Sequence, residues 1–363
     1  MVKMKAKKKY AYEPDYAVAP GETLFEVMTS LDMNQKELAQ RLELTEQTLI
    51  RIFKGDQPIS YVTANRLELV TRVPARFWNN LEAEYREQLA KIEERQRLVK
   101  SIEWLKNIPV KELIDRGCIE PQPDKVSTLR EVLKFFGVGS VAAWAEIWDV
   151  PAVAARRSPC FETRPGVASA WIRQGELQAH EVACQPYDKA RFKEALKQIR
   201  GLTSQPAEVF EPEMKRLCAE AGVAVALVRE MKKVPWSGAT KWLTPSKAMI
   251  LLCLRGRGED KFWFSFFHEA GHILYDSKKD LLINDGSHDD PREERANQYA
   301  ADILIPEKYN RTILTLRSRA EVIQMAADLG ISPGILVGRY QHLTGKWDFF
   351  KDLIRPLQWA ESK

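Results

Sequence analysis

The sequence is short of three features that mark common classes of protein. Five cysteines occur in 363 residues and none forms a Cys-x-x-Cys pair, which argues for free thiols in a reducing compartment and against cysteine-ligated zinc. No apolar run approaches the roughly 18 residues that cross a bilayer. The basic N-terminal stretch lacks the apolar core of a secretory signal. These absences predict a cytoplasmic protein without a membrane-spanning segment.

An excess of positive charge is also missing from most of the chain. There are 55 Lys and Arg against 50 Asp and Glu, which gives a formal net charge of +5. Five lysines lie within the first ten residues, so the remaining 50 basic residues equal the 50 acidic ones. We therefore expect a neutral body and, over residues 1–20, a disordered basic tail that either contacts DNA phosphates or is simply solvated.

Histidine is rare, with five in the chain, yet His268 and His272 flank Glu269 in a His-Glu-x-x-His motif. On a helix this spacing places both imidazoles on one face, where they can bind one zinc ion while Glu269 reaches a water molecule beside it. Apolar residues on both sides of the motif predict a buried helix over residues 262–275. Buried polar groups need partners, and the alternative to a metal is hydrogen bonding to neighbouring side chains.

Near the other end of the chain, residues 21–77 show short helical periods separated by tight breaks. Two of these helices begin at the N-cap residues Asn34 and Thr45, and the second of them stops at Gly55. Two short helices joined by such a turn form a helix-turn-helix. The exposed side of the second helix carries polar side chains able to bond to base edges, so DNA is an expected partner. The alternative is a bundle used only for dimerisation or partner binding.

The string NQKELAQRLELTEQTLIRIFKG (residues 34–55) resembles the Xre/Cro-like helix-turn-helix family, in its antitoxin-type branch. One departure is Glu43, where the family often has glycine in a left-handed turn; another residue there costs roughly 1 kcal/mol. The resemblance implies that Gln35 contacts a phosphate at the helix start and that Lys54 contacts the DNA backbone. It also implies base contacts in the major groove, made by Glu46, Gln47, Thr48 and Arg51.

The residues that follow are predicted to be helical up to a small sheet. Residues 78–105 form a charged linker or dimerisation helix, because a narrow apolar stripe runs along them and helix-turn-helix proteins usually read paired half-sites. Residues 106–215 form a helical middle region. A strand over residues 223–231 and a hairpin over 238–254 then lead into the helix of the motif. The edge of such a sheet can hold an extended peptide.

A catalytic zinc usually takes three protein ligands, so the sequence should supply one more. Pro291 opens an acidic helix start about 20 residues after the motif, and Glu293 and Glu294 lie in its first turn. Spacing alone leaves both as candidates. His288, in the preceding polar loop, is a weaker alternative.

The motif together with EERANQYAADILIP (residues 293–306) resembles the ImmA/IrrE family of zinc metallo-endopeptidase domains, over about residues 190–345. The resemblance implies Zn²⁺ bound by His268, His272 and Glu293. Asn297 would hold the tautomer of a ligating histidine, and Glu269 would act as the general base. An oxyanion donor besides zinc is also required. The candidates are His342, Tyr340, Tyr299 and Tyr275, and we favour His342.

The predicted fold is therefore multidomain and mainly α-helical. A helix-turn-helix bundle and the helical middle region precede a C-terminal α+β, zincin-like metallopeptidase domain at residues 216–345, with a tail at 346–363. The resemblance implies a DNA-binding transcriptional regulator that cleaves a partner repressor or antitoxin. Paired half-sites and the stripe on residues 78–105 add the expectation of a homodimer. Its setting would be a stress, mobile-element or toxin–antitoxin response. The alternative is a non-proteolytic regulator whose metal domain is a sensor or partner-binding module, although such a site needs no general base.

Overall fold

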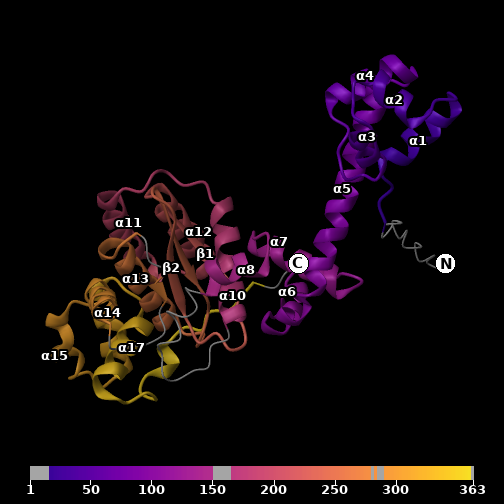
Figure 1. Cartoon of the computed structure of the whole chain (residues 1–363). Helices are drawn as coiled ribbons and strands as arrows, with labels where there is room; N and C mark the ends of the chain where they lie inside the picture. The colour runs from indigo at the N-terminus through magenta and orange to yellow at the C-terminus, as the bar shows by residue number, and fades with distance from the viewer. Residues whose placement is uncertain (1–15, 150–164, 279–281, 284–289, 361–363) are drawn as a thin grey trace, which may run out of the picture. The chain divides into compact units, whose positions relative to one another are not determined.

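A computed structural model describes residues 16–149, 165–278, 282–283 and 290–360 and separates the chain into two compact units, Met1–Glu103 and Trp104–Lys363 (Figure 1). The described residues are mainly helical, and one small sheet lies in the second unit, as predicted. Most of the predicted basic tail lies outside the described residues, and so do His288 and Cys160. The other four cysteines are free thiols.

The first unit is a bundle of short helices followed by one long helix. Asn34 and Thr45 cap their helices as predicted: their side chains accept hydrogen bonds from the backbone N–H groups of Glu37 and Thr48. Glu43 adopts the left-handed conformation, with φ 54°, at the turn between them. The helices are α1 (Pro20–Ser30), α2 (Gln35–Arg41), α3 (Glu46–Phe53), α4 (Tyr61–Thr71) and α5 (Ala75–Val99).

Helix α5 is tied to the loop that follows α3. Its buried Glu82 accepts hydrogen bonds from the backbone N–H of Ile59 at 3.0 Å and from Arg86 at 2.7 Å. Arg86 also donates to the carbonyl of Gly55 at 2.9 Å. The predicted apolar stripe is half-buried within the unit (Leu81, Tyr85, Leu89, Ile92).

The sheet of the second unit has the strand order β1-β3-β2-β4. The predicted hairpin is formed by β2 (Gly238–Thr244) and β3 (Lys247–Leu252), which pair antiparallel. On the far side of β3, β1 (Val223–Leu227) runs parallel to it. The two-residue β4 (Leu282–Ile283) pairs antiparallel with Ala239 and Thr240 of β2.

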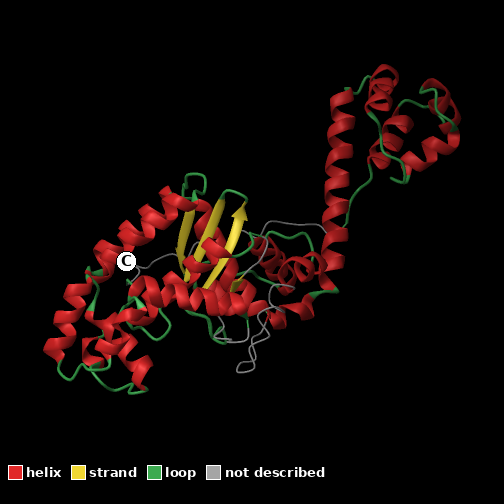
Figure 2. Ribbon diagram, turned by 90° about the vertical axis from the view of Figure 1, so that its left-hand side faces the viewer, coloured by secondary structure: helices red, strands yellow, loops and turns green. Residues whose placement is uncertain are grey.

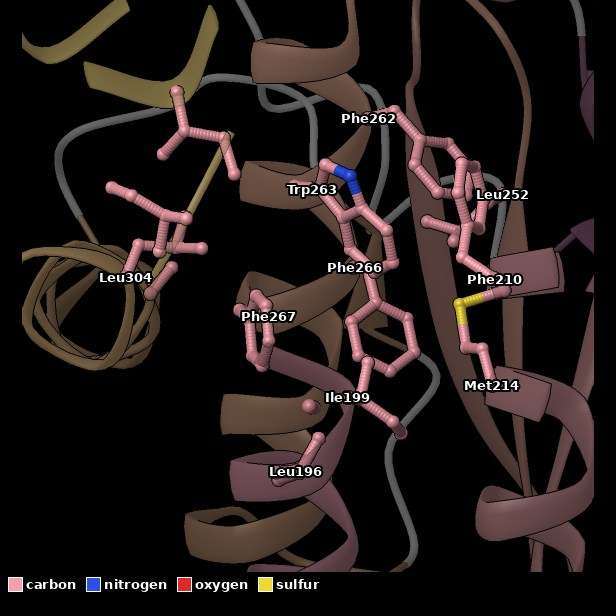
Figure 3. Packing of buried hydrophobic residues seen from close by; sticks show 14 of the residues in the cluster. Leu196, Ile199, Phe210, Met214, Leu252, Phe262, Trp263, Phe266, Phe267 and Leu304 are labelled. Carbon is pink, nitrogen blue, oxygen red and sulfur yellow. The ribbon is translucent and has the colours of Figure 1, made fainter. Parts of the chain in front are cut away.

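Alternation along these strands makes both faces of the sheet apolar, so helices cover both faces (Figure 2). One face is covered by α11 (Lys189–Gly201), α12 (Ala207–Glu220) and α13 (Glu259–Tyr275). Figure 3 shows the aromatic side chains of α13 packed among Phe210, Met214 and Leu252. The other face is covered mainly by α10 (Pro165–Glu181).

The helices predicted as a middle region share their cores with the rest of the second unit, because a sheet with two apolar faces needs cover on both. Gly175 of α10 shows how close this packing is, since a Cβ there would lie 2.7 Å from Leu251. The remaining helices on the N-terminal side are η1 (Ile102–Asn107), α6 (Val110–Asp115), α7 (Lys125–Phe136), α8 (Val141–Trp144), η2 (Ala145–Asp149) and η4 (Leu202–Ser204).

The predicted C-terminal tail is attached to the beginning of α13. The N–H of Glu259 donates to the carbonyl of Arg355 at 3.0 Å, and the N–H of Leu357 donates to the carbonyl of Arg257 at 2.7 Å. The elements between α13 and this segment, besides β4, are α14 (Pro291–Leu304), η5 (Glu307–Tyr309), α15 (Asn310–Ile313), α16 (Arg319–Leu329), α17 (Pro333–Thr344) and η6 (Lys351–Leu353).

No single helix among the described residues is long and apolar enough to cross a membrane. Helices α16 and α17 reach the required length and composition only as a pair bent by 113°. Both contribute buried side chains to the core around α13.

Candidate metal centre

The His-Glu-x-x-His motif lies in the second half of α13, where the predicted buried helix is found. His268, Glu269 and His272 are 0%, 0% and 1% exposed. Helix α14 packs closely against this part of α13 because Gly271 has no side chain: a Cβ there would lie 3.2 Å from the Cα of Ala296. The close approach brings the first turn of α14 to the two imidazoles.

Three side chains converge on one point between these helices. The Nε2 atoms of His268 and His272 lie 3.0 Å apart. The carboxylate of Glu293, which is 6% exposed, lies 3.1 Å from the first of these nitrogens and 3.2 Å from the second. Within the described part of the chain, these three residues form the one group of His, Cys, Asp and Glu with metal-ligand spacing.

The outer nitrogen of each imidazole faces an oxygen. His268 Nδ1 lies 2.9 Å from the amide oxygen of Asn297, and His272 Nδ1 lies 2.6 Å from a carboxylate oxygen of Asp276. Arg295 pairs with the other oxygen of Asp276. Because both oxygens accept hydrogen bonds, each Nδ1 carries a proton, and each ring in its neutral form presents its Nε2 lone pair inward.

Two lone pairs and a carboxylate that face one another repel unless a cation lies between them. Protonation of His272 is one way to relieve this repulsion. Burial works against the charged imidazolium, but Glu293, Glu269 and Asp276 outweigh it and raise the pKa of His272 to about 9. Burial also opposes ionisation of Glu293, but hydrogen bonds from the two imidazoles lower its pKa to about 2. Two imidazoles and a carboxylate are a donor set that suits zinc, so the residues present fit a metal.

Glu269 lies beside this group with one carboxylate oxygen held and the other without a partner. The hydroxyl of Thr240 donates to its Oε2 at 2.7 Å, and its buried Oε1 has no hydrogen-bond partner among the described residues. Gly238 leaves the space that this carboxylate occupies, since a Cβ there would lie 2.5 Å from Oε1. Burial raises the pKa of Glu269, although the nearby imidazoles and Thr240 act in the opposite direction.

Two family models match the chain. Residues 228–340 match the peptidase family described as the IrrE N-terminal-like domain, and residues 24–78 match the family described as helix-turn-helix. Both matches have the order and position that the motifs predict, so the resemblances stated from the sequence are confirmed. No curated protein matches the chain. The chain therefore joins a helix-turn-helix DNA-binding domain to an IrrE-like peptidase domain with a metallopeptidase-type fold.

Within the peptidase domain, the alternative ligands differ from Glu293 in their placement. Glu294 is exposed on the outer side of α14, and His288 lies outside the described residues. Asn297 lies where the resemblance places it. Asp276, by contrast, was not predicted, although it follows His272 by four residues and a histidine and a carboxylate at that spacing can meet at a helix end. Thr240 and Gly238 were also not predicted, because they reach α13 only through the folding of β2.

The predicted oxyanion donors are spread over the peptidase domain. His342 is exposed, and its helix α17 approaches the first turn of α13: a Cβ at Gly338 would lie 2.9 Å from Asp260. Tyr340 is buried against Phe349 and Phe350. Tyr275 and Tyr299 lie at the other end of α13, with ring centroids 5.5 Å apart. The role of oxyanion donor stays a prediction for all four.

In the helix-turn-helix domain, the predicted DNA-contacting residues lie on the surface of α2 and α3. All are exposed except Thr48, which is half-buried and whose hydroxyl lies 2.9 Å from that of Thr45 at the helix cap. No ion pair joins Arg51 or Lys54 to the other residues that the structure describes, so both cations can meet phosphate or base oxygens. Their individual contacts with DNA stay predictions.

Proposed function

We propose that the protein is a zinc-dependent endopeptidase that binds DNA through its first domain and cleaves a partner protein such as a repressor or antitoxin. The observation that carries this proposal is the inward-facing set of His268, His272 and Glu293 beside the unpartnered carboxylate oxygen of Glu269. The first three are the proposed metal ligands, and Glu269 is the proposed general base.

An open coordination position favours catalysis over a structural role. Structural zinc sites are closed by four protein ligands, whereas catalytic sites have three and leave one position for water or substrate. The described part of the peptidase domain offers three ligands. A structural site would also have no use for a buried carboxylate with a free oxygen, since leaving it without a partner costs stability.

The chain's own residues have distinct tasks in peptide hydrolysis. Zinc, when bound, supplies a Lewis acid that polarises the substrate carbonyl and makes water a stronger nucleophile. Glu269 accepts the proton of the attacking water through its free Oε1 and returns it to the leaving amine. Thr240 holds the second oxygen of Glu269 and so aims the first. Asp276 and Asn297 hold the two imidazoles in the tautomer that binds a metal.

The raised pKa of Glu269 suits this task. A carboxylate with an ordinary pKa is a weak base near neutral pH, and burial makes it stronger. The nearby imidazoles and the Thr240 hydroxyl act against this rise.

The fusion to a DNA-binding domain points to a regulatory substrate. A peptidase that is held at chosen DNA sites meets proteins bound there at high effective concentration. Repressors and antitoxins are such proteins, and their cleavage would switch a stress, mobile-element or toxin–antitoxin response. Since helix-turn-helix proteins usually read paired half-sites, we further propose a homodimer formed through the stripe of α5.

The experiment compares cells that express the wild type with cells that express the Glu269→Gln variant. New protein N-termini are mapped by mass spectrometry in both, and the matched control is Glu294→Gln, which removes an exposed carboxylate one residue from a proposed ligand. We expect one or a few N-termini that the wild type and the control produce and Glu269→Gln does not. If Glu269→Gln produces the same N-termini and the same phenotype, the protein is the non-proteolytic regulator instead.

A further inference from the structure

A cluster of rings and ammonium groups lies at the C-terminal end of α13, beyond the proposed metal ligands. The Nζ of Lys278 lies 4.2 Å above the ring of Trp242 and 5.4 Å above that of Tyr187. The Nζ of Lys189 lies 5.4 Å above the ring of Tyr275. With Tyr299, which meets Tyr275 edge to face, these residues form a set that we name the aromatic shelf.

The aromatic shelf has two halves, one formed by Lys278 with Trp242 and Tyr187 and the other by Lys189 with Tyr275 and Tyr299. Tyr187 and Trp242 meet edge to face with their centroids 4.8 Å apart. Burial raises the pKa of the Tyr299 phenol, and the nearby phenols of Tyr275 and Tyr187 raise it further. Tyr187 lies in the segment before α11, two residues from Lys189, whereas Tyr275 and Tyr299 belong to α13 and α14.

Trp242 and Tyr275 of the aromatic shelf belong to β2 and α13, which also carry residues of the metal centre. Trp242 follows Thr240 by two residues and so lies on the same face of β2. Tyr275 follows His272 by three residues on α13. Thr240 contacts Glu269, and Trp242 contacts Lys278 just beyond α13, so the strand and the helix run the same way.

Because β2 and α13 run in the same direction, the length of α13 gives the distance from the aromatic shelf to the bond that would be cleaved. The six residues from Glu269 to Tyr275 span roughly 9 Å of helix. An extended peptide covers that length in about three residues, at roughly 3.3 Å each. The aromatic shelf is therefore within reach of a side chain two or three residues from the bond at the metal.

The two lysines of the aromatic shelf can each form further ion pairs or hydrogen bonds. Both lysines are exposed, and no ion pair joins either of them to another described residue. The ammonium of Lys278 donates one hydrogen bond, to the carbonyl of Pro245 at 2.8 Å, out of the three it can make. The nearby Asp188 caps α11 by accepting from the N–H of Arg191 at 2.8 Å. Stacking on the rings holds both ammonium groups in place, so less side-chain freedom is lost when an anion binds.

We propose that the aromatic shelf is a substrate subsite that binds an acidic side chain two or three residues from the cleaved bond. The carboxylate meets Lys278 and Lys189, and the exposed ring of Tyr275 covers the methylene groups of a glutamate. This inference rests on the proposed peptidase function and specifies the substrate class: a polypeptide with an acidic residue at that spacing. Partly exposed ion pairs each change binding by about 1.5- to 5-fold, so two of them predict about a 2- to 25-fold preference for Glu over Gln.

Peptide hydroxamates test the subsite without knowledge of the natural substrate, because the hydroxamate anchors on zinc and fixes the register of the side chains. We would measure the Kd of the zinc-loaded full chain for paired compounds that differ only in Glu or Gln, placed two or three residues from the hydroxamate. Compounds are needed in which the peptide extends from the hydroxamate in either chain direction. The variants are Lys189→Ala/Lys278→Ala and, as a matched control, Lys308→Ala, whose Nζ lies 5.0 Å above the ring of Tyr309.

We expect the wild type and Lys308→Ala to bind the Glu compound about tenfold more tightly than the Gln compound at low salt, with a smaller ratio at high salt. The double variant should bind both compounds alike, with the affinity that the wild type has for the Gln compound. Equal binding of the two by the wild type, or an unchanged preference in the double variant, would overturn the subsite and leave the peptidase proposal intact. Failure of every hydroxamate to bind would overturn the metal site and the subsite with it.

Discussion

Replacement of Asp276 tests the proposed zinc centre through a residue that is not one of its ligands. The Asp276 carboxylate lies 2.6 Å from His272 Nδ1, so it fixes the ring and increases the electron density at the ligating nitrogen. Asp276→Asn leaves an oxygen that can still accept this hydrogen bond but removes the charge. Asp276→Ala removes both. Zinc affinity should therefore fall in the order wild type, Asp276→Asn, Asp276→Ala.

The size of the effect follows from the kind of contact. Loss of such an outer partner typically lowers metal affinity by about 10- to 100-fold, or roughly 1.4 to 2.7 kcal/mol. We expect about tenfold for Asp276→Asn and closer to a hundredfold for Asp276→Ala. The pairing of Asp276 with Arg295 adds a further check, because Arg295→Ala should weaken zinc binding less than either.

The assay is competition for zinc between the purified protein and a chelator of known affinity at pH 7. Asp302→Asn is the matched control, since Asp302 is exposed on α14 and only accepts a hydrogen bond from Gln298. Circular dichroism confirms that each variant is folded. Zinc affinity of Asp276→Ala within twofold of the wild type would refute the assignment of the imidazole tautomers, and with it the argument for converging lone pairs.

Three further predictions concern the base, the metal-free site and the DNA-binding domain. Thr240→Val should keep zinc but move the acidic limb of the cleavage–pH profile to higher pH, while Thr240→Ser should not. In the EDTA-treated protein, the interactions that raise the pKa of His272 stabilise the fold fully below pH 6.5, and this stabilisation is lost as the pH rises through about 9. The interactions that lower the pKa of Glu293 stabilise the fold above pH 4.5. Its Tm should therefore fall between pH 6.5 and 9, and a flat profile would contradict this. Arg51→Ala should weaken binding to operator DNA by about tenfold, more than the exposed Arg97→Ala.

The sequence predicts best what depends on spacing within one helix or turn. His268, Glu269 and His272 are set by helical periodicity alone. The caps at Asn34 and Thr45 and the hairpin of β2 and β3 also depend on near neighbours, and the structure contains them all.

What the sequence did not predict depends on contacts between distant segments. Gly238 and Thr240 serve Glu269 only because β2 lies against α13, about 30 residues away along the chain. Glu293 and Glu294 cannot be told apart until the close approach at Gly271 fixes which side of α14 faces the imidazoles. Helices α10 to α12 look like a separate region until the sheet they cover has formed.

The most direct test of the central claim is to measure zinc content and cleavage in the same two purified proteins, the wild type and Glu269→Gln. The substrate is the partner protein whose new N-terminus is found in cells. We predict one zinc per chain in both proteins and cleavage of the partner by the wild type alone. Equal cleavage by both proteins, or folded wild type that binds no zinc, would contradict the account.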